Sequence, residues 1–256
     1  MKAALVTGSS RGIGRGIALA LAEKGFSIAV NGRGEGPAMD ETCAAIEARG
    51  VQVARVPGDV SDLSLHETML AAAAERLGTP LTTLVCNAGV GALRRADMLE
   101  AQEDSWDHVM NINAKAVFFL TQAFARDLVA RERDPSLPYT ISIISSVSAV
   151  ASSINRAEYC VSKAAAAMVA KTFAHRLAPE GIQVFDFQPG VIETDLTAPV
   201  LATYEKMNRE TPFTLIPRFG QPGEIGKAVA AAANGELPYC VGQVIRPDGG
   251  ISLQRL

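Results

Sequence analysis

The chain has 256 residues, of which 48% are hydrophobic and 20% are charged, and its formal net charge is −3. This composition is typical of a folded globular protein with a large core, and it excludes a disordered chain. The small negative charge gives no basis for binding nucleic acid or an anionic membrane surface, so neither partner is expected.

Short apolar runs alternate with runs of helical spacing along the whole chain. The apolar runs predict strands at 3–7, 26–31, 51–57, 81–86, 140–145, 182–187 and 243–247. The runs of helical spacing predict helices at 14–24, 37–49, 65–77, 106–131 (as one helix or two), 159–177 and 225–233. Strands that are apolar throughout, each followed by a helix, are typical of a parallel sheet that is buried on both faces. We therefore expect an α/β fold, with residues 1–256 forming a single domain around a Rossmann-like, doubly wound parallel sheet flanked by helices on both faces.

The stretch 191–223 carries no clear pattern and contains four prolines, Pro199, Pro212, Pro217 and Pro222. A long irregular segment in a compact domain is often a functional loop or lid. We therefore expect residues 191–223 to form an irregular loop that takes part in binding the substrate.

The first predicted strand ends in a glycine-rich turn that reads Thr7-Gly8-Ser9-Ser10-Arg11-Gly12-Ile13-Gly14. Glycines permit a tight turn, close approach of the backbone to a phosphate, and close packing of the next helix, whose N-terminus attracts anions. The spacing Gly-x3-Gly-x-Gly differs from the usual Gly-x-Gly-x-x-Gly, and a purely structural turn is the alternative. Its position after the first strand favours a dinucleotide site formed by Gly8, Ser10, Arg11, Gly12, Ile13 and Gly14.

The second predicted strand ends with Val30-Asn31-Gly32-Arg33 and lacks the carboxylate that commonly binds the ribose 2′-hydroxyl of NAD. Nothing at this end would repel a 2′-phosphate, and guanidinium groups are well suited to bind one. Arg33 and Arg11 are the candidates, although both could instead be solvated loop residues. This strand end predicts NADP(H) in preference to NAD(H).

Tyr159 and Lys163 lie four residues apart in a predicted helix, so their side chains share one face. An ammonium group beside a phenol favours the phenolate and lowers the tyrosine pKa from its ordinary value near ~10. Such a tyrosine could donate or accept a proton near neutral pH. The same pair on an exposed helix face would simply be solvated, so the rest of the chain must distinguish the two cases.

Several motifs, taken in order, resemble those of the classical short-chain dehydrogenases/reductases, in particular the branch that includes 3-oxoacyl-[acyl-carrier-protein] reductases. They are Thr7-Gly8-x3-Gly12-x-Gly14, Asn87-Ala88-Gly89, Ser146 and Tyr159-x-x-x-Lys163, with Pro189-Gly190 and Asp248-Gly249-Gly250 as further matches. The resemblance covers essentially the whole chain. It implies an enzyme that interconverts a carbonyl and a secondary alcohol by hydride transfer with a nicotinamide cofactor.

The resemblance also implies roles for the catalytic residues. Tyr159 would be the general acid or base, and Lys163 would lower its pKa and bind the nicotinamide ribose. Ser146, which lies 13 residues before Tyr159, would bond the substrate oxygen. Ser145 and Ser148 are alternatives for that role, and the family's spacing favours Ser146.

Further roles follow from the same resemblance. Asn113 resembles the asparagine that supports a water-linked proton relay through the catalytic lysine, with Asn111 as its local competitor. Asp59 and Val60 resemble the pair that contacts adenine, and capping of the next helix by Asp59 is the alternative. The remaining cofactor-binding residues implied are Asn87, Ala88, Gly89, Tyr159, Lys163, Pro189, Gly190, Ile192 and Thr194.

The substrate is less defined than the reaction. Glu180 stands where carrier-protein reductases often have an arginine, and the charges of Arg94, Arg95, Arg156 and Glu158 near the expected site favour a polar or sugar-like substrate as much as an acyl chain. A small carbonyl or alcohol substrate is expected, and 3-oxoacyl-[acyl-carrier-protein] reductase, sugar or polyol dehydrogenase and non-catalytic nucleotide-binding relative are the alternatives. Family resemblance implies a homotetramer or a homodimer.

The four cysteines, Cys43, Cys86, Cys160 and Cys240, are scattered without a CxxC pair, and the three histidines do not cluster. This arrangement predicts reduced thiols and no metal site. The chain enters a strand-like run at Lys2 without the pattern of a signal peptide, and no apolar stretch is long enough to span a bilayer. We therefore expect a cytoplasmic protein.

Overall fold

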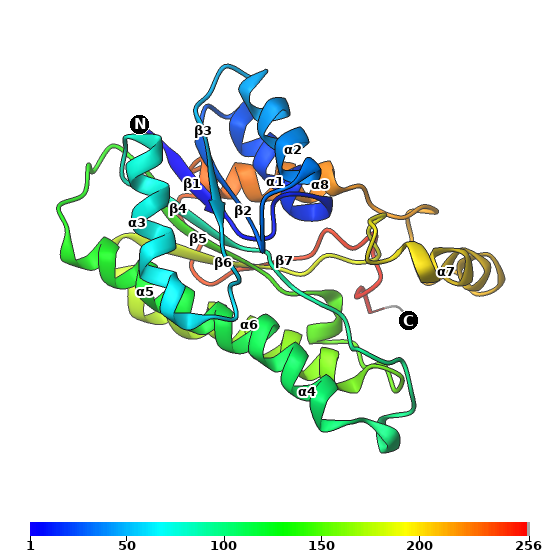
Figure 1. Cartoon of the computed structure of the whole chain (residues 1–256). Coiled ribbons are helices and arrows are strands. Elements are labelled where there is room, and N and C mark those ends of the chain that lie inside the picture. Colours follow the sequence, from blue (N-terminus) through cyan, green and yellow to red (C-terminus); the bar gives the residue numbers. More distant parts are fainter. Residues whose placement is uncertain (255–256) are drawn as a thin grey trace.

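The computed structural model describes residues 1–254, and its centre is a parallel sheet of seven strands (Figure 1). The strands are β1 (Ala3–Val6), β2 (Ser27–Gly32), β3 (Val53–Pro57), β4 (Thr83–Cys86), β5 (Tyr139–Ile144), β6 (Ile182–Phe187) and β7 (Val244–Ile245). Their order is β3-β2-β1-β4-β5-β6-β7 with every neighbouring pair parallel, which confirms the predicted doubly wound sheet. Because the strand order reverses between β1 and β4, the carboxyl ends of these strands border the crevice in which such folds bind ligands.

Helices cover both faces of the sheet (Figure 1). On one face lie α1 (Gly12–Glu23), α2 (Pro37–Glu47) and α8 (Pro222–Ala233), and on the other lie α3 (His66–Leu77), α5 (Ala116–Ala130) and α6 (Ala157–Leu177). In β1, Ala4 and Val6 pack against the first group, whereas Ala3 and Leu5 pack against the second. Burial on both faces explains why the strands are apolar without alternation. In the described part of the chain, no helix is long and apolar enough to cross a bilayer.

The predicted helix over 106–131 is one continuous helical run over residues 103–130. It consists of α4 (Glu103–Met110), a π-helical turn (Asn111–Lys115) and α5. Turns of this kind are frequent at functional sites. Here the turn leaves Asn113 completely buried while Asn111 remains exposed.

The expectation of an irregular loop over 191–223 is wrong in its middle, where α7 (Ala198–Glu210) forms a helix of 13 residues. None of the described side chains of α7 is buried, so the helix carries no apolar stripe and shows none of the periodicity that marks a buried helix. Pro199 suggests a turn, but a proline in the first turn of a helix removes no hydrogen bond. Figure 1 shows α7 projecting beyond the sheet, at the right of the view.

Candidate active site

A cavity of about 120 Å³ opens at the carboxyl ends of the central strands. The walls come from the start of α1, the loops after β4, β5 and β6, and the start of α6. The predicted site residues that line it are Ile13, Asn87, Gly89, Ser146, Tyr159, Lys163, Pro189, Gly190, Ile192 and Thr194. The fold therefore brings together residues from the start of α1 to the segment after β6, which are far apart in the sequence.

Tyr159 and Lys163 lie in the first turns of α6 and both face this cavity. The Lys163 ammonium nitrogen is 5.8 Å from the centre of the Tyr159 ring. The same nitrogen donates a 3.0 Å hydrogen bond to the carbonyl oxygen of Ile144, at the end of β5. Lys163 is buried, and its other two N–H groups have no hydrogen-bond acceptor among residues 1–254. The amine is thus held at the cavity with donors to spare for a ligand.

Hydrogen bonding distinguishes the three serines that could hold the substrate oxygen. Ser146 Oγ accepts a hydrogen bond from the backbone N–H of Ser148 at 3.1 Å, which leaves its own proton available to the cavity. Ser145 also lines the cavity, but its hydroxyl donates to the carboxylate of Asp186. Ser148 does not line the cavity. The geometry favours Ser146, as the spacing predicted.

Asn113 does not line the cavity but anchors one of its walls. Its Oδ1 accepts from the backbone N–H of Val90 at 2.9 Å, and its Nδ2 donates to the carbonyl oxygen of Val90 at 2.9 Å and to Ser162 Oγ at 3.0 Å. These bonds tie the loop after β4 to α6. A Cβ atom at Gly89 would lie 3.2 Å from Asn113 Oδ1 and 3.3 Å from Lys163 Nζ, so this loop passes close to both side chains. Asn111, on the exposed side, makes no such link.

The glycine-rich turn is packed against the loop after β4. Gly8 and Gly12 have φ values of 61° and 56°, which favour glycine, and a Cβ atom at Gly14 would lie 2.3 Å from the carbonyl oxygen of Gly8. Asn87 Nδ2 donates to the carbonyl oxygens of Thr7 and Gly8 at 2.8 and 3.2 Å. No side chain caps the N-terminus of α1, so its first backbone N–H groups stay free for an anion.

The two arginines expected near a 2′-phosphate differ in their surroundings. Arg33 follows β2 and is exposed, with no ion pair in the described part of the chain. Arg11 Nη1 lies 3.6 Å from Asp195 Oδ2, and both side chains are largely exposed. Arg33 is therefore the freer of the two to bind a phosphate.

Asp59 and Val60 follow β3 and lie outside the cavity. The Asp59 carboxylate accepts from the backbone N–H of Ser61 at 2.9 Å and from its hydroxyl at 2.7 Å, and these bonds lower the pKa of Asp59. The alternative that Asp59 caps the next helix is wrong, because Asp62 caps the short turn that precedes α3. Val60 is buried, and its carbonyl oxygen contacts His66 Nε2 at 2.8 Å.

Asn31 is a site residue that the sequence motifs did not single out. At the end of β2 its Oδ1 accepts from the backbone N–H of Gly8 at 3.2 Å, and its Nδ2 donates to the carbonyl oxygens of Val56 and Gly58. The side chain is almost completely buried. It fixes the glycine-rich turn relative to the ends of β2 and β3, and a polar residue closing an apolar strand was the available signal.

A buried carboxyl group behind Ser145 was also missed. Asp186 on β6 accepts from the Ser145 hydroxyl and, at 2.7 Å, from Gln188 Nε2. Gln188 Oε1 accepts in turn from Arg246 Nε at 2.9 Å. Burial raises the pKa of Asp186. This chain of hydrogen bonds connects the segment after β7 to the floor of the cavity.

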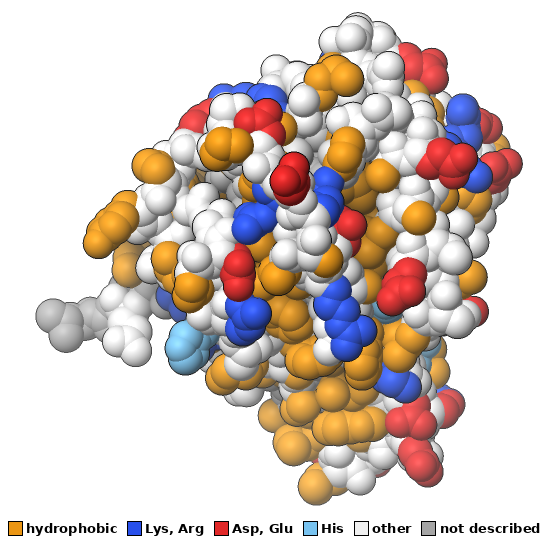
Figure 2. Space-filling view, turned by 90° about the vertical axis from the view of Figure 1, so that its left-hand side faces the viewer, with side chains coloured by type: hydrophobic (Ala, Val, Ile, Leu, Met, Phe, Trp, Pro, Cys, Tyr) orange, Lys and Arg blue, Asp and Glu red, His pale blue; other side chains and the backbone are white. Residues whose placement is uncertain are grey.

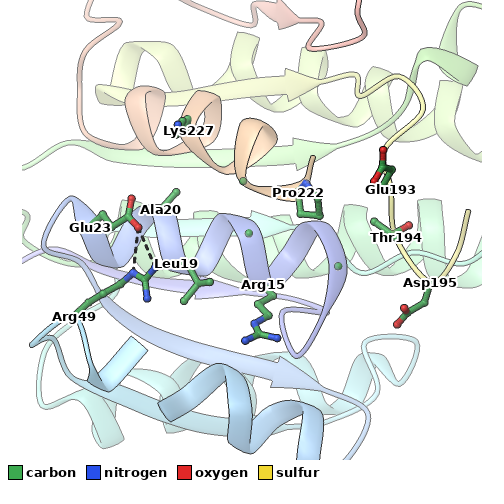
Figure 3. A pocket seen from close by; sticks show the side chains of 13 residues that line it. Arg15, Leu19, Ala20, Glu23, Arg49, Glu193, Thr194, Asp195, Pro222 and Lys227 are labelled. Carbon is green, nitrogen blue, oxygen red and sulfur yellow. Dashed lines mark hydrogen bonds and ion pairs between the residues drawn. The ribbon is translucent and has the colours of Figure 1, made fainter. Parts of the chain in front are cut away.

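A larger hollow of about 460 Å³ lies between α1 and α8 (Figure 3). Two of the charged side chains that line it form an ion pair with each other, Arg49 with Glu23 at 3.1 Å. Thr194 borders both hollows, but none of the predicted catalytic side chains lines the larger one. Size favours this hollow, whereas the groups that can transfer a proton gather in the smaller cavity, and chemistry is the stronger criterion for an active site.

Comparison with known proteins gives consistent matches over the whole chain. A family profile described as short chain dehydrogenase matches residues 2–205. A 3-oxoacyl-[acyl-carrier-protein] reductase of Staphylococcus aureus is 36% identical over 252 residues, which are 98% of this chain and 98% of the relative. The crystal structure of a 3-oxoacyl-[acyl-carrier protein] reductase from Brucella melitensis in complex with NAD has a TM-score of 0.94 at 37% identity and covers 100% of this chain and 98% of that one.

A second solved structure differs from the first in its cofactor. It is a putative 2-deoxy-d-gluconate 3-dehydrogenase from Agrobacterium tumefaciens with bound NADP, with a TM-score of 0.87 at 31% identity, covering 99% of this chain and 97% of that one. One similar structure holds NAD and the other holds NADP, so overall similarity does not distinguish the two cofactors. The residues of the site itself have to be considered.

Proposed function

The chain belongs to the short-chain dehydrogenase family and is an NAD(P)-dependent oxidoreductase, and we propose that it interconverts a carbonyl and a secondary alcohol with Tyr159 as general acid and base. The observation that carries the proposal is the convergence of Tyr159, Ser146 and Lys163 on one cavity at the carboxyl ends of the strands. A hydroxyl donor, a phenol and a buried ammonium group are what a carbonyl reduction needs from the protein.

The proposed steps use these side chains directly. The nicotinamide cofactor supplies or accepts the hydride when it is bound. In the reducing direction, the Tyr159 phenol donates its proton to the carbonyl oxygen, and the Ser146 hydroxyl donates a hydrogen bond to the same oxygen. Lys163, fixed by the carbonyl oxygen of Ile144, keeps a positive charge beside the phenol and binds the nicotinamide ribose. Alcohol oxidation runs through the same contacts, with Tyr159 accepting the proton.

We propose that the cofactor lies along the carboxyl ends of the strands, from the glycine-rich turn to the segment after β6. The uncapped N-terminus of α1 fits the phosphates of a bound dinucleotide. The remaining contacts proposed are Ser10, Arg11, Ile13, Asp59, Val60, Ala88, Pro189, Gly190, Ile192 and Thr194. Asn113 supports the proton relay indirectly: its side chain is engaged in three hydrogen bonds, and these hold the loop after β4 in place.

Substitution of Tyr159 by Phe tests the reaction. Loss of the phenolic proton should lower kcat/KM by about 10²- to 10⁴-fold, which is the range of general acid catalysis, while NADPH affinity stays within about twofold. Reduction of a panel of ketones and fluorescence titration of NADPH measure the two quantities. Tyr139→Phe is the matched control and should retain activity, because Tyr139 begins β5, at the end of the strand away from the cavity. Unchanged turnover in the Tyr159 variant would remove this residue from the mechanism.

We propose NADP(H) as the preferred cofactor because β2 ends without a carboxylate and Arg33 has a free guanidinium group there. Arg33→Ala should weaken NADPH binding about 10- to 100-fold, the value of a lost charge-assisted hydrogen bond, and leave NADH within about twofold. Arg133→Ala, in the loop before β5, is the control. Equal losses for both cofactors would show that Arg33 does not recognise the 2′-phosphate.

We propose that residues 191–223, including α7, close one side of the substrate site, since Leu196 and Thr197 line the cavity. The substrate is a small carbonyl or alcohol compound. A 3-oxoacyl-[acyl-carrier-protein] reductase is the second candidate, supported by the names of the similar proteins. At position 180 this chain has a glutamate, and Glu180 is paired with Arg176 at 3.0 Å. No unpaired positive charge is therefore present there to bind an acidic carrier protein. A sugar dehydrogenase and a non-catalytic relative remain as alternatives that the ketone panel separates.

We propose a cytoplasmic homotetramer or homodimer assembled through α5 and α6. Large hydrophobic side chains are exposed on these helices, and Figure 2 shows hydrophobic side chains gathered over the lower part of the face that it presents. They are Phe118, Phe119, Val129, Val161 and Met168. Burial of such a patch favours association of copies, and analytical ultracentrifugation measures it.

A further inference from the structure

Arg156 is a cation beside the catalytic tyrosine that the reaction described above does not use. It is the last residue before α6, and its guanidinium carbon lies 5.2 Å from the centre of the Tyr159 ring. The side chain is half-buried, and its Nε is completely buried without a hydrogen-bond partner. Within residues 1–254 the guanidinium group forms neither a hydrogen bond nor an ion pair, so its charge is unpaired, and its terminal nitrogens remain accessible while Nε is buried.

The neighbouring charges do not neutralise this group. Glu158 is buried, and its Oε1 accepts a 2.7 Å hydrogen bond from the Ser105 hydroxyl, which directs it toward α4. Arg94 is bound to Asp104 by two hydrogen bonds of 3.0 and 2.7 Å. Arg156 is therefore a cation without a counterion beside the start of α6. Arg95, on the loop after β4, also has no ion pair in the described part of the chain, but its Nη1 donates to the Tyr204 hydroxyl at 3.4 Å.

The position of Arg156 suits it to bind an anionic group of the substrate rather than one of the cofactor. It lies over the ring of the residue that contacts the reacting oxygen, and it immediately precedes the positive end of a 21-residue helix. A guanidinium group binds a carboxylate through two parallel hydrogen bonds, and partial burial strengthens that attraction relative to water. One such group matches the single charge of a carboxylate better than the nearly double charge of a phosphate monoester.

We propose that Arg156 is the specificity-determining residue of the site and that the substrate is a carbonyl or hydroxy compound carrying a carboxylate, in other words a keto acid or hydroxy acid. The inference rests on the proposed function and narrows its substrate class. The carboxylate binds the terminal nitrogens of Arg156 while Tyr159 and Ser146 hold the carbonyl oxygen. Arg156 takes no part in the proton transfer.

The test compares keto acids, in which the carboxylate lies at increasing distance from the ketone, with the methyl esters of the same acids. Wild-type enzyme should reduce at least one acid with kcat/KM about tenfold above that of its ester. Arg156→Gln should lower kcat/KM for the acid about 10- to 100-fold, mainly through KM, and leave the ester within about twofold. Arg156→Lys should recover part of the loss, and Arg133→Gln, the control in the loop before β5, should change neither substrate.

Each outcome decides between the inference and the proposed function. Equal use of acids and esters, or equal losses on both in Arg156→Gln, would overturn the carboxylate role while the oxidoreductase activity stands. Preference for a phosphorylated ketose over every keto acid would also overturn it. If wild-type enzyme reduces no ketone, the proposed function fails, and calorimetry of keto acids with the NADP⁺ complex then decides: no difference in affinity between wild type and Arg156→Gln would overturn the inference as well.

Discussion

The glycine-rich turn and the segment 191–223 border the same cavity, but they are held in place in different ways. In the turn, the backbone fills the available space, since a Cβ atom at Gly14 would lie 2.3 Å from the carbonyl oxygen of Gly8. In the segment, side chains hold the backbone. The Thr197 hydroxyl donates to the carbonyl oxygen of Ile192 at 2.6 Å. Asn208 Oδ1 accepts from the backbone N–H groups of Phe213 and Thr214, both at 3.0 Å.

The difference shows which part of the site is free to change. Backbone contacts of the turn depend on the absence of side chains, so almost any substitution there alters the cofactor site. The segment is mostly exposed, with α7 burying none of its described side chains, so its sequence can vary without disturbing the core. A fold of this design keeps one cofactor site and can present different surfaces to the substrate.

The same substitution made in both regions should have opposite effects, and this is the largest effect expected. Gly14→Ala places a methyl group against Gly8 and against Asn87 Nδ2, which would be 2.5 Å away. We expect a loss of about 3 kcal/mol in the free energy of unfolding and loss of measurable NADPH binding, because backbone has to move. Urea unfolding and NADPH fluorescence titration measure both.

Gly223→Ala is the matched variant, because Gly223 also lies in the first turn of a helix but has nothing within 4 Å of its Cβ position. Alanine should raise the stability by up to about 0.5–1 kcal/mol through its better helix propensity and leave NADPH affinity unchanged. Similar losses in the two variants would mean that the turn is no more constrained than the segment.

The sequence predicted the elements that bury apolar surface and failed where none is buried. The strands and the helices packed on them were recognisable because burial leaves a periodic or continuous apolar pattern. α7 (Ala198–Glu210) has no such pattern, so its existence depends on local propensity and on side-chain contacts that the sequence does not mark.

The site divides in the same manner. Tyr159 and Lys163 were predictable because the helix fixes their mutual position, and the glycines because their spacing marks a turn. The hydrogen-bonded chain from Asp186 through Gln188 to Arg246 was not, because Arg246 meets the other two only through the pairing of β6 with β7. Residue types that lie 58 positions apart carry no local pattern, and only the folded sheet brings them together.

The smallest effect expected concerns the ion pair that closes the segment 191–223 onto α8. Arg218 binds both oxygens of Glu224 at 2.8 and 2.6 Å, and Glu224 also accepts from the backbone N–H of Gln221. These hydrogen bonds lower the pKa of Glu224 to about 2 from its ordinary value of 4.5. Because the Glu224 side chain is 43% exposed, solvent screening reduces its contribution to about 1 kcal/mol.

The sign of the pH dependence follows from the lowered pKa. A carboxylate with a lowered pKa stabilises the folded state above its ordinary pKa, and that stabilisation disappears as the pH falls from about 4.5 to about 2. Glu224→Gln should therefore be less stable than wild type by about 1 kcal/mol at neutral pH, with a difference that shrinks through this acidic window. Urea unfolding across the pH range measures it, with Glu205→Gln on α7 as the control without an ion pair in the described structure. A difference that stays constant with pH would assign the loss to packing and weaken the argument that paired side chains hold this segment.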